Sequence, residues 1–165
     1  MREIERKFLI ETDKIPSLTV HDYQHIVQGY PNWSFDSFVY RLRMVEHRLI
    51  EKEKLMEIKY YQTFKEVKAK SRLEIEVELL QSQFEPLSKL CEYVLEKQRY
   101  EIPTKNNIIE LDIYLNDLSG LVIAEVEFNT ELECNAYIPE PWFGKEVTDD
   151  NNYSNYMLAK NRLPK

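Results

Sequence analysis

Charged and apolar residues alternate along several stretches of the chain. In residues 72–79 every second residue is charged, and every residue between is Leu, Ile or Val. Residues i and i+2 of a strand point to the same face of a sheet, so this pattern predicts a strand with one charged and one apolar face. Lys97 and Arg99 repeat the spacing of the charged residues. The same alternation predicts further strands over 3–8, 40–44, 58–65, 109–113 and 124–128.

Two other stretches have the apolar spacing of helices. Steps of three or four between apolar residues predict a surface helix over about 85–96, with Pro86 in its first turn. Near the C-terminus, Tyr153, Tyr156 and Met157 predict a helix that ends before Pro164. The sequence Asn-Asp-Leu-Ser-Gly at 116–120 predicts the tight turn of a hairpin. Because most connections are too short for parallel crossovers, we expect an antiparallel sheet with added helices, an α+β fold.

Length, charge and composition narrow the class of protein. A chain of 165 residues with 43% apolar residues predicts one globular domain spanning 1–165. We expect a cytoplasmic protein, because the charged N-terminus lacks the apolar run of a secretory signal and two cysteines fit a reducing compartment. The net charge of −7 argues against partners that are nucleic acids or anionic membranes. With only three glycines, no glycine-rich phosphate loop can be built, so any phosphate must be held by side chains.

The charged faces of the expected strands admit two interpretations. In the ordinary antiparallel arrangement they meet water and the apolar faces form the core. If the sheet closes into a barrel, they could instead line a water-filled lumen, with the apolar faces outward beneath the helices. Both signs of charge occur on these faces. A polyphosphate needs several Arg and Lys donors, and the divalent cations that accompany it need carboxylate ligands, so such a lumen would suit that class of ligand.

Several charged motifs follow one another in a set order along almost the whole chain. They are E-x-E-x-K at 3–7, Q-G-Y at 28–30, R-x-R at 41–43, T-x-K at 63–65, R-x-E-x-E at 72–76, K-x-R at 97–99, a strand aspartate at 112, A-E-x-E at 124–127 and P-W-F-G-K-E-V-T at 141–148. This order resembles the CYTH family, also called the triphosphate tunnel metalloenzymes, and the tail resembles its short bacterial members. The resemblance implies a closed barrel of eight antiparallel strands, the tunnel, with helices packed outside it.

The resemblance also implies roles for individual residues. Lys7 with Tyr30 would form a catalytic dyad for triphosphate hydrolysis. The basic residues expected to bind the phosphate oxygens are Lys7, Arg41, Arg43, Lys65, Arg72, Lys97 and Arg99. The carboxylates expected to hold Mg or Mn, directly or through water, are Glu3, Glu5, Glu74, Glu76, Asp112, Glu125 and Glu127.

The leading functional hypothesis is a metal-dependent triphosphatase that acts on a small triphosphate, inorganic tripolyphosphate in the first place. Thiamine triphosphatase and class IV-type adenylate cyclase are alternative activities of the same tunnel, and a non-catalytic polyphosphate-binding module is an alternative from another class. The cyclase would need a pocket for adenine, and no motif in the sequence identifies one. A monomer and a homodimer are both compatible with the sequence.

Overall fold

The computed structural model consists mainly of eight β-strands. It describes residues 2–18, 22–33, 38–49, 54–66 and 72–164, and the side chains of these residues except 2, 3 and 72. The strands are β1 (Arg2–Leu9), β2 (Tyr23–Pro31), β3 (Phe38–Leu49), β4 (Lys54–Glu66), β5 (Arg72–Leu79), β6 (Cys91–Pro103), β7 (Ile108–Tyr114) and β8 (Val122–Phe128). The helices are α1 (Gln81–Ser88), α2 (Glu131–Ala136) and α3 (Asn155–Asn161), with short 3-10 turns at Thr12–Lys14, Asn116–Leu118 and Asn151–Tyr153. No helix in this part of the chain is long and apolar enough to cross a membrane.

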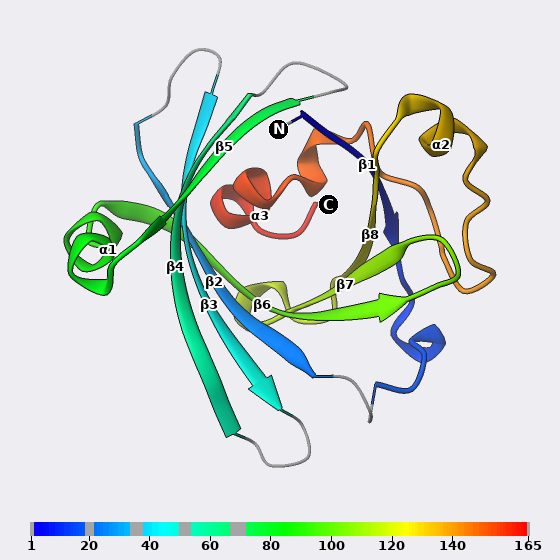
Figure 1. The fold of residues 1–165 in the computed structure, drawn as a ribbon, viewed down its shortest axis with the longest axis horizontal. Helices are drawn as coiled ribbons and strands as arrows, with labels where there is room; N and C mark the ends of the chain where they lie inside the picture. The colour runs from blue at the N-terminus through cyan, green and yellow to red at the C-terminus, as the bar shows by residue number, and fades with distance from the viewer. Residues whose placement is uncertain (1, 19–21, 34–37, 50–53, 67–71, 165) are drawn as a thin grey trace.

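The strands form one strongly curved antiparallel sheet (Figure 1). Their spatial order is β1-β5-β4-β3-β2-β6-β7-β8, and every neighbouring pair is antiparallel. The predicted hairpin is present, since β7 and β8 are joined by the turn at Asn116–Leu118. The expected α+β fold with an antiparallel eight-stranded sheet is therefore confirmed.

The seam between β1 and β5 differs from the expected continuous barrel wall. β1 pairs with β8 along six residues but with β5 only through Arg2 and Glu3. Further along the same strand, the amide of Leu9 donates to the carbonyl of Lys145, and the amide of Val147 donates to the carbonyl of Lys7. The segment 144–148 thus pairs with the β1 backbone where β5 does not. The tail motif P-W-F-G-K-E-V-T therefore contributes its last residues to the wall at this seam.

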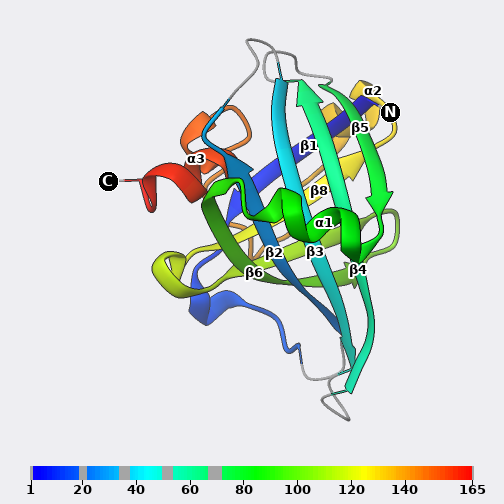
Figure 2. The ribbon, with the colours of Figure 1, turned by 90° about the vertical axis from the view of Figure 1, so that its left-hand side faces the viewer.

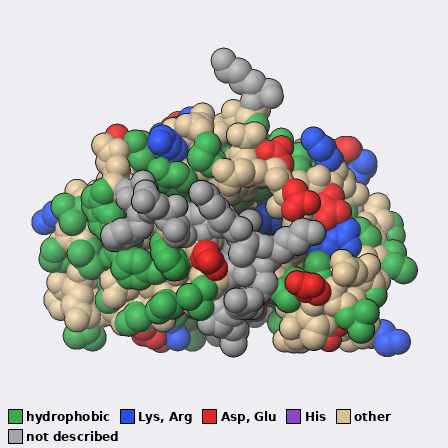
Figure 3. Space-filling view, turned by 90° about the horizontal axis from the view of Figure 1, so that it is seen from above, with side chains coloured by type: hydrophobic (Ala, Val, Ile, Leu, Met, Phe, Trp, Pro, Cys, Tyr) green, Lys and Arg blue, Asp and Glu red, His purple; other side chains and the backbone are tan. Residues whose placement is uncertain are grey.

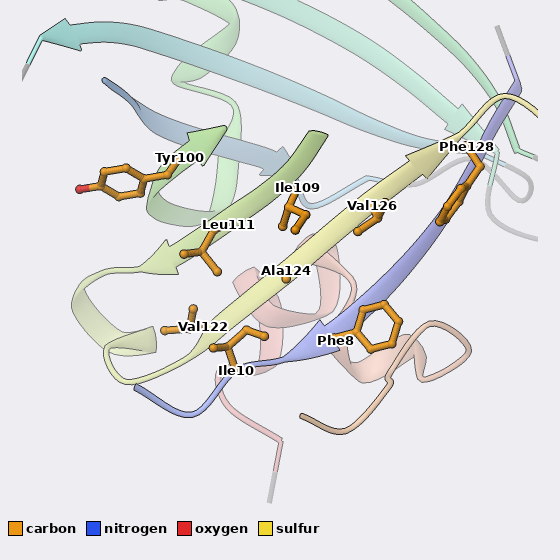
Figure 4. Close-up of a cluster of buried hydrophobic side chains, with 9 residues drawn as sticks. All are labelled: Phe8, Ile10, Tyr100, Ile109, Leu111, Val122, Ala124, Val126 and Phe128. Atoms are coloured by element: carbon orange, nitrogen blue, oxygen red, sulfur yellow. The ribbon is translucent and has the colours of Figure 1, made fainter. Parts of the chain in front are cut away.

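Half of the sheet is covered on its outer face. We call β1, β6, β7 and β8 the covered half, because their outward apolar side chains form a buried cluster (Figure 4). The segment before β2, the residues around α2 and the aromatic pair Trp142 and Phe143 pack against this cluster. The ring centroid of Phe143 lies 4.8 Å from that of Phe8. Burial of such side chains stabilises the fold by about 1.5–3 kcal/mol each.

The outer face of β3, β4 and β5, the open half, is covered unevenly: Tyr40 and Leu42 of β3 are buried, whereas β5 is exposed. α1 lies across the strands on this side (Figure 2), where the ring of Phe84 packs 4.8 Å from that of Tyr60. The outward residues Leu73, Ile75 and Val77 of β5 are exposed. The expectation that the apolar faces lie beneath helices thus holds for the covered half and is wrong for β5.

The predicted helix over 85–96 is only partly correct. The helix, α1, spans Gln81–Ser88, and β6 begins at Cys91. Val94 and Leu95 therefore lie in a strand, on its two opposite faces. Leu95 is buried on the inner face, whereas Val94 on the outer face is 45% exposed. An apolar residue on each face removes the alternation that identified the other strands. The C-terminal helix is confirmed as α3, which ends at Asn161, before Pro164.

Candidate active site

The charged faces of the strands point to the concave side of the sheet. Arg41 on β3 donates to Glu74 on β5 at 3.1 Å, although β4 lies between these strands. Arg99 on β6 likewise donates to Glu125 on β8 at 2.8 Å, across β7. Side chains can meet across an intervening strand only on the concave face of a curved sheet. The charged-interior interpretation is therefore correct, and we call this space the lumen.

The covered half of the lumen contains a tightly paired group of buried charges. Asp112 accepts two hydrogen bonds from Arg99, each 2.7 Å long, and forms an ion pair with Lys97. Burial lowers the pKa of Lys97 to about 8, helped by repulsion from Arg99 and opposed by Asp112. For Arg99 burial acts in the same direction, but attraction to Asp112 and Glu110 outweighs it, and its pKa lies well above its usual value. Arg99 is thus a permanent cation in a fixed orientation.

Lys7 and two carboxylates continue this group along β1 and β8. The Lys7 Nζ lies 2.6 Å from Glu125 and 3.4 Å from Glu5. Burial would raise the pKa of Glu125, but Lys7 and Arg99 hold it well below its usual value. Glu125 is therefore a carboxylate that stays ionised within the lumen.

The open half of the lumen contains two arginines on one strand. Arg41 and Arg43 both donate to Glu76, and Thr63 donates to the same carboxylate at 3.0 Å. Burial and repulsion from Arg41 lower the pKa of Arg43. The Nε of Arg43 is buried and has no hydrogen-bond partner among the described residues. This N–H can donate a hydrogen bond to an anionic oxygen of a ligand without giving up another hydrogen bond.

The two halves line a single lumen. Lys65 on β4 lies 3.3 Å from Glu74 in the open half and 3.9 Å from Glu5 on β1. Glu5 in turn contacts Lys7 of the covered half. The basic and acidic residues of both halves are thus within reach of one small ligand.

One end of the lumen is apolar. On each strand of the covered half, the inward residue two positions from a charged lumen residue is apolar or aromatic. These residues are Leu9, Leu95, Tyr114 and Ile123, which lie two positions from Lys7, Lys97, Asp112 and Glu125, respectively. These apolar side chains form a cluster with Leu158 and Ala159 of α3. The helix appears within the curve of the strands in Figure 1 and to one side of them in Figure 2. We call this end the floor of the lumen.

Tyr30 lies where the charged part of the lumen meets the floor. Its ring contacts Tyr156 of α3 edge-on, with 5.5 Å between centroids, and its hydroxyl donates to Gln28 at 3.4 Å. Burial raises the pKa of Tyr30 to about 12, against the attraction of Arg41 and Lys7. The hydroxyl is therefore protonated at neutral pH and acts as a hydrogen-bonding group, not as a base.

The opposite end of the lumen is rich in carboxylates. A cavity of about 520 Å³ is lined by Glu101, Glu110 and Glu127, and a neighbouring cavity of about 530 Å³ reaches Arg99. We call this end the mouth. Seen from above, acidic and basic side chains gather on the right of the molecule, and apolar ones on the left (Figure 3).

The carboxylates fit a divalent cation that arrives with a phosphate ligand. Glu5 and Glu127 are directly opposite in the β1–β8 pairing, an arrangement of like charges that is unfavourable without a cation. Among the side chains that the structure describes, no three His, Cys, Asp or Glu form a ready metal cage. Mg²⁺ usually takes one or two carboxylates and completes its shell with water and substrate phosphates. Glu5 and Glu127 fit that requirement, and Glu125 lies on the same inward row as Glu127 but is already paired with Lys7 and Arg99.

The structure brings together most of the residues proposed from the motifs. Lys97 differs from the other basic residues because its side chain is fully buried. It pairs with Asp112, and its Nζ lies over the ring of Tyr114. The side chains of Glu3 and Arg72 lie outside the described residues. The lumen also contains polar residues that the motif-based set omitted: Gln28, Thr63 and Glu110. Strand alternation does place Glu110 and Thr63 on the inward faces, so the pattern contained a signal for both.

Eight antiparallel strands around a lumen of paired charges define a tunnel protein for an anionic, phosphate-rich ligand. Two curated relatives named inorganic triphosphatase match nearly the whole chain. The one from Nitrosomonas europaea is 38% identical over 96% of this chain and 97% of its own length. The one from Acetivibrio thermocellus is 37% identical over 97% of this chain and 94% of its own.

Solved structures agree with these relatives. A crystal structure of an inorganic triphosphatase superposes with a TM-score of 0.64 and 35% identity, covering 99% of this chain and 97% of the other. A putative adenylate cyclase from Bacillus halodurans, 15% identical with a TM-score of 0.50 over 90% of this chain and 97% of the other, shares the fold. No protein-family model matches the chain. The chain belongs to the inorganic triphosphatases of the CYTH, or triphosphate tunnel, family.

Proposed function

We propose that this protein hydrolyses inorganic tripolyphosphate to pyrophosphate and phosphate within the lumen, with Mg²⁺ or Mn²⁺. The buried Nε of Arg43, which lacks a partner among the described residues, carries this proposal. A buried donor left unpaired costs free energy, and a phosphoryl oxygen would satisfy it. The names of the full-length relatives support the choice of substrate.

The basic residues would bind and orient the triphosphate from both halves of the lumen. Arg41 and Arg43 offer planar forks that suit phosphate oxygens, and Lys7 and Lys65 add point charges near Glu5. Arg99 would contribute a cation whose orientation Asp112 fixes. These groups stabilise the charge that develops on the phosphoryl oxygens as the bond to the leaving pyrophosphate breaks.

A metal ion would be held by Glu5, Glu125 and Glu127, with the other carboxylates as further or water-mediated ligands. When bound, it would neutralise phosphate charge and favour attack by water. Tyr30, protonated and next to Lys7 in the lumen, would hold the attacking water by a hydrogen bond. The floor beside Tyr30 is apolar and filled by side chains, so it offers the base of a nucleotide no space beyond the triphosphate.

The proposal also includes a closed tunnel wall, a cytoplasmic location and an oligomeric state. The pairing of β1 with β5 and with the segment 144–148 would complete a closed tunnel wall of the short bacterial type. Tripolyphosphate would be a cytoplasmic substrate, and its hydrolysis requires neither nucleic acid nor a membrane. Either a monomer or a homodimer could perform it, because all lumen residues come from one chain.

Substitution of Arg43 tests the proposal. With Mg²⁺ and tripolyphosphate, Arg43→Ala should raise KM by about tenfold or more, and Arg43→Lys by less, because lysine keeps the charge and loses the fork. Phosphate release and cyclic AMP formation from ATP are followed in parallel. Arg162→Ala, at an exposed ion pair with Asp117, is the control and should match wild type.

Two results would contradict the proposal. If both Arg43 variants keep the wild-type kcat and KM, the lumen is not the binding site. If the wild-type protein makes cyclic AMP from ATP and leaves tripolyphosphate intact, the cyclase alternative is correct and the substrate assignment fails.

A further inference from the structure

Arg99 already uses its donors on carboxylates of the protein. Its Nε and Nη2 donate to Asp112, and Nη2 also donates to Glu125. Its remaining nitrogen, Nη1, forms an ion pair with Glu110. These contacts use four of the five N–H groups of the guanidinium, so a phosphoryl oxygen that binds Nη1 must share this nitrogen with Glu110 or replace Glu110 there.

Glu110 is the carboxylate that can be replaced most readily. Asp112 is fully buried between Arg99 and Lys97, and Glu125 is buried and also bound to Lys7. Glu110 lies nearer the mouth, with 24% of its side chain exposed, and lines the 520 Å³ cavity there. Moving it outward would break one ion pair and leave the buried network intact.

The neighbours of Glu110 oppose its position. It lies directly opposite Glu101 on β6 and Glu125 on β8, so three carboxylates form a row across three strands. Like charges directly opposite one another destabilise a sheet. Arg99 is the cation paired with Glu110, whereas Glu125 is also paired with Lys7. Once a phosphate takes the Nη1 of Arg99, repulsion from the neighbouring carboxylates favours the outward movement of Glu110.

We propose that Glu110 is a positioning residue that holds the Nη1 of Arg99 and yields it to a phosphoryl oxygen of the substrate. This inference rests on the proposed function and adds a residue to it. Glu110 keeps the guanidinium oriented toward the mouth, and it competes with substrate for the same nitrogen. Because of this competition, the protein binds triphosphate less tightly than it would if Glu110 did not occupy Arg99.

The test is tripolyphosphate binding in the absence of divalent metal. Calorimetry in EDTA should show that Glu110→Gln, which keeps the shape and removes the charge, binds tripolyphosphate about fivefold more tightly than wild type. With Mg²⁺, KM should fall by a similar factor while kcat changes less. Glu110→Ala provides a second variant if the glutamine disturbs folding, and it should also gain affinity.

Glu101→Gln is the matched control. Glu101 lies opposite Glu110 at the mouth, but its hydrogen bond is to Gln24 and not to Arg99. If the gain in affinity came only from reducing negative charge at the mouth, Glu101→Gln would show the same gain, and the inference would be wrong. We expect a clearly smaller change for this variant.

Other outcomes separate this inference from the proposed function. Unchanged or weaker binding by both Glu110 variants, with wild-type hydrolysis intact, overturns the role of Glu110 and leaves the triphosphatase assignment standing. A raised Mg²⁺ requirement of Glu110→Gln without any gain in metal-free affinity would identify Glu110 as a metal ligand instead. Wild-type protein that neither binds nor hydrolyses tripolyphosphate overturns both.

Discussion

The covered and open halves of the sheet place the same types of residue in different surroundings. In the covered half, Asp112 is completely buried in the lumen and Val126 is completely buried on the outside. In the open half, Glu76 has 30% of its side chain exposed and Ile75 on the outer face is 51% exposed. The covered half is therefore buried on both faces, whereas the open half combines buried residues, such as Thr63 and Leu42, with partly exposed ones on both faces.

This difference assigns different physical tasks to the two halves. A buried ion pair contributes little net stability, because desolvation offsets the attraction, but removing one partner is costly. The pairs around Asp112 therefore fix the positions of Arg99 and Lys97. Arg41 and Arg43 are nearly as buried as Arg99, but their shared partner Glu76 is 30% exposed, so we infer that the open half exchanges partners more readily and adapts to the ligand, while the covered half orients it.

Asp112→Asn should have the largest effect on stability. The variant leaves Lys97 and Arg99 without their shared buried counter-charge, and we expect the free energy of unfolding to fall by about 3–5 kcal/mol. Urea denaturation measures this change. The matched change in the open half, Glu76→Gln, should lower the free energy of unfolding by less than about 1 kcal/mol, since the Glu76 side chain is itself 30% exposed. Equal losses would show that the halves do not differ in this way.

A pH dependence of stability tests the burial of Lys97. Its pKa in the folded protein is about 8, whereas a lysine in the unfolded chain has a pKa of about 10.4. Between these values the unfolded chain binds more protons than the folded one, so the free energy of unfolding rises as the pH increases through this window. Below about pH 8 both states are protonated and this contribution is constant.

The experiment compares urea denaturation of metal-free protein at about pH 7.5 and pH 9.5. Wild type should gain stability over this interval relative to Lys97→Met, which lacks the titrating group. Lys65→Met, which removes a lumen cation with 22% side-chain exposure in the open half, is measured alongside as a matched loss of charge. A Lys97→Met slope equal to wild type would mean that Lys97 keeps an ordinary pKa.

Alternation in the sequence predicted the strands that have one charged and one apolar face. It did not predict a strand where both faces carry apolar residues. The alternation over 72–79 identified β5 because its inner residues are charged and its outer residues apolar. In β6, Val94 and Leu95 are both apolar, since Leu95 packs inward on the floor, and the helical reading resulted. The floor itself depends on contacts between α3 and distant strands, which local periodicity does not contain. The charges of the lumen could be predicted from motif order, but their pairing, including that of Glu110 with Arg99, depends on strand register.

Substitutions on the outer face should give the smallest effect and the simplest comparison of the two halves. Ile75→Thr removes an apolar group that is half in water, so the free energy of unfolding should change by no more than about 0.5 kcal/mol. Val126→Thr makes a similar change on β8, where the side chain is fully buried among apolar neighbours, and a hydroxyl without a partner should cost about 1–3 kcal/mol. Thermal or urea unfolding of the two variants measures the difference. A large loss of stability from Ile75→Thr would show that the outer face of β5 is covered in solution. The exposure of the open half would then be a property of the single chain alone.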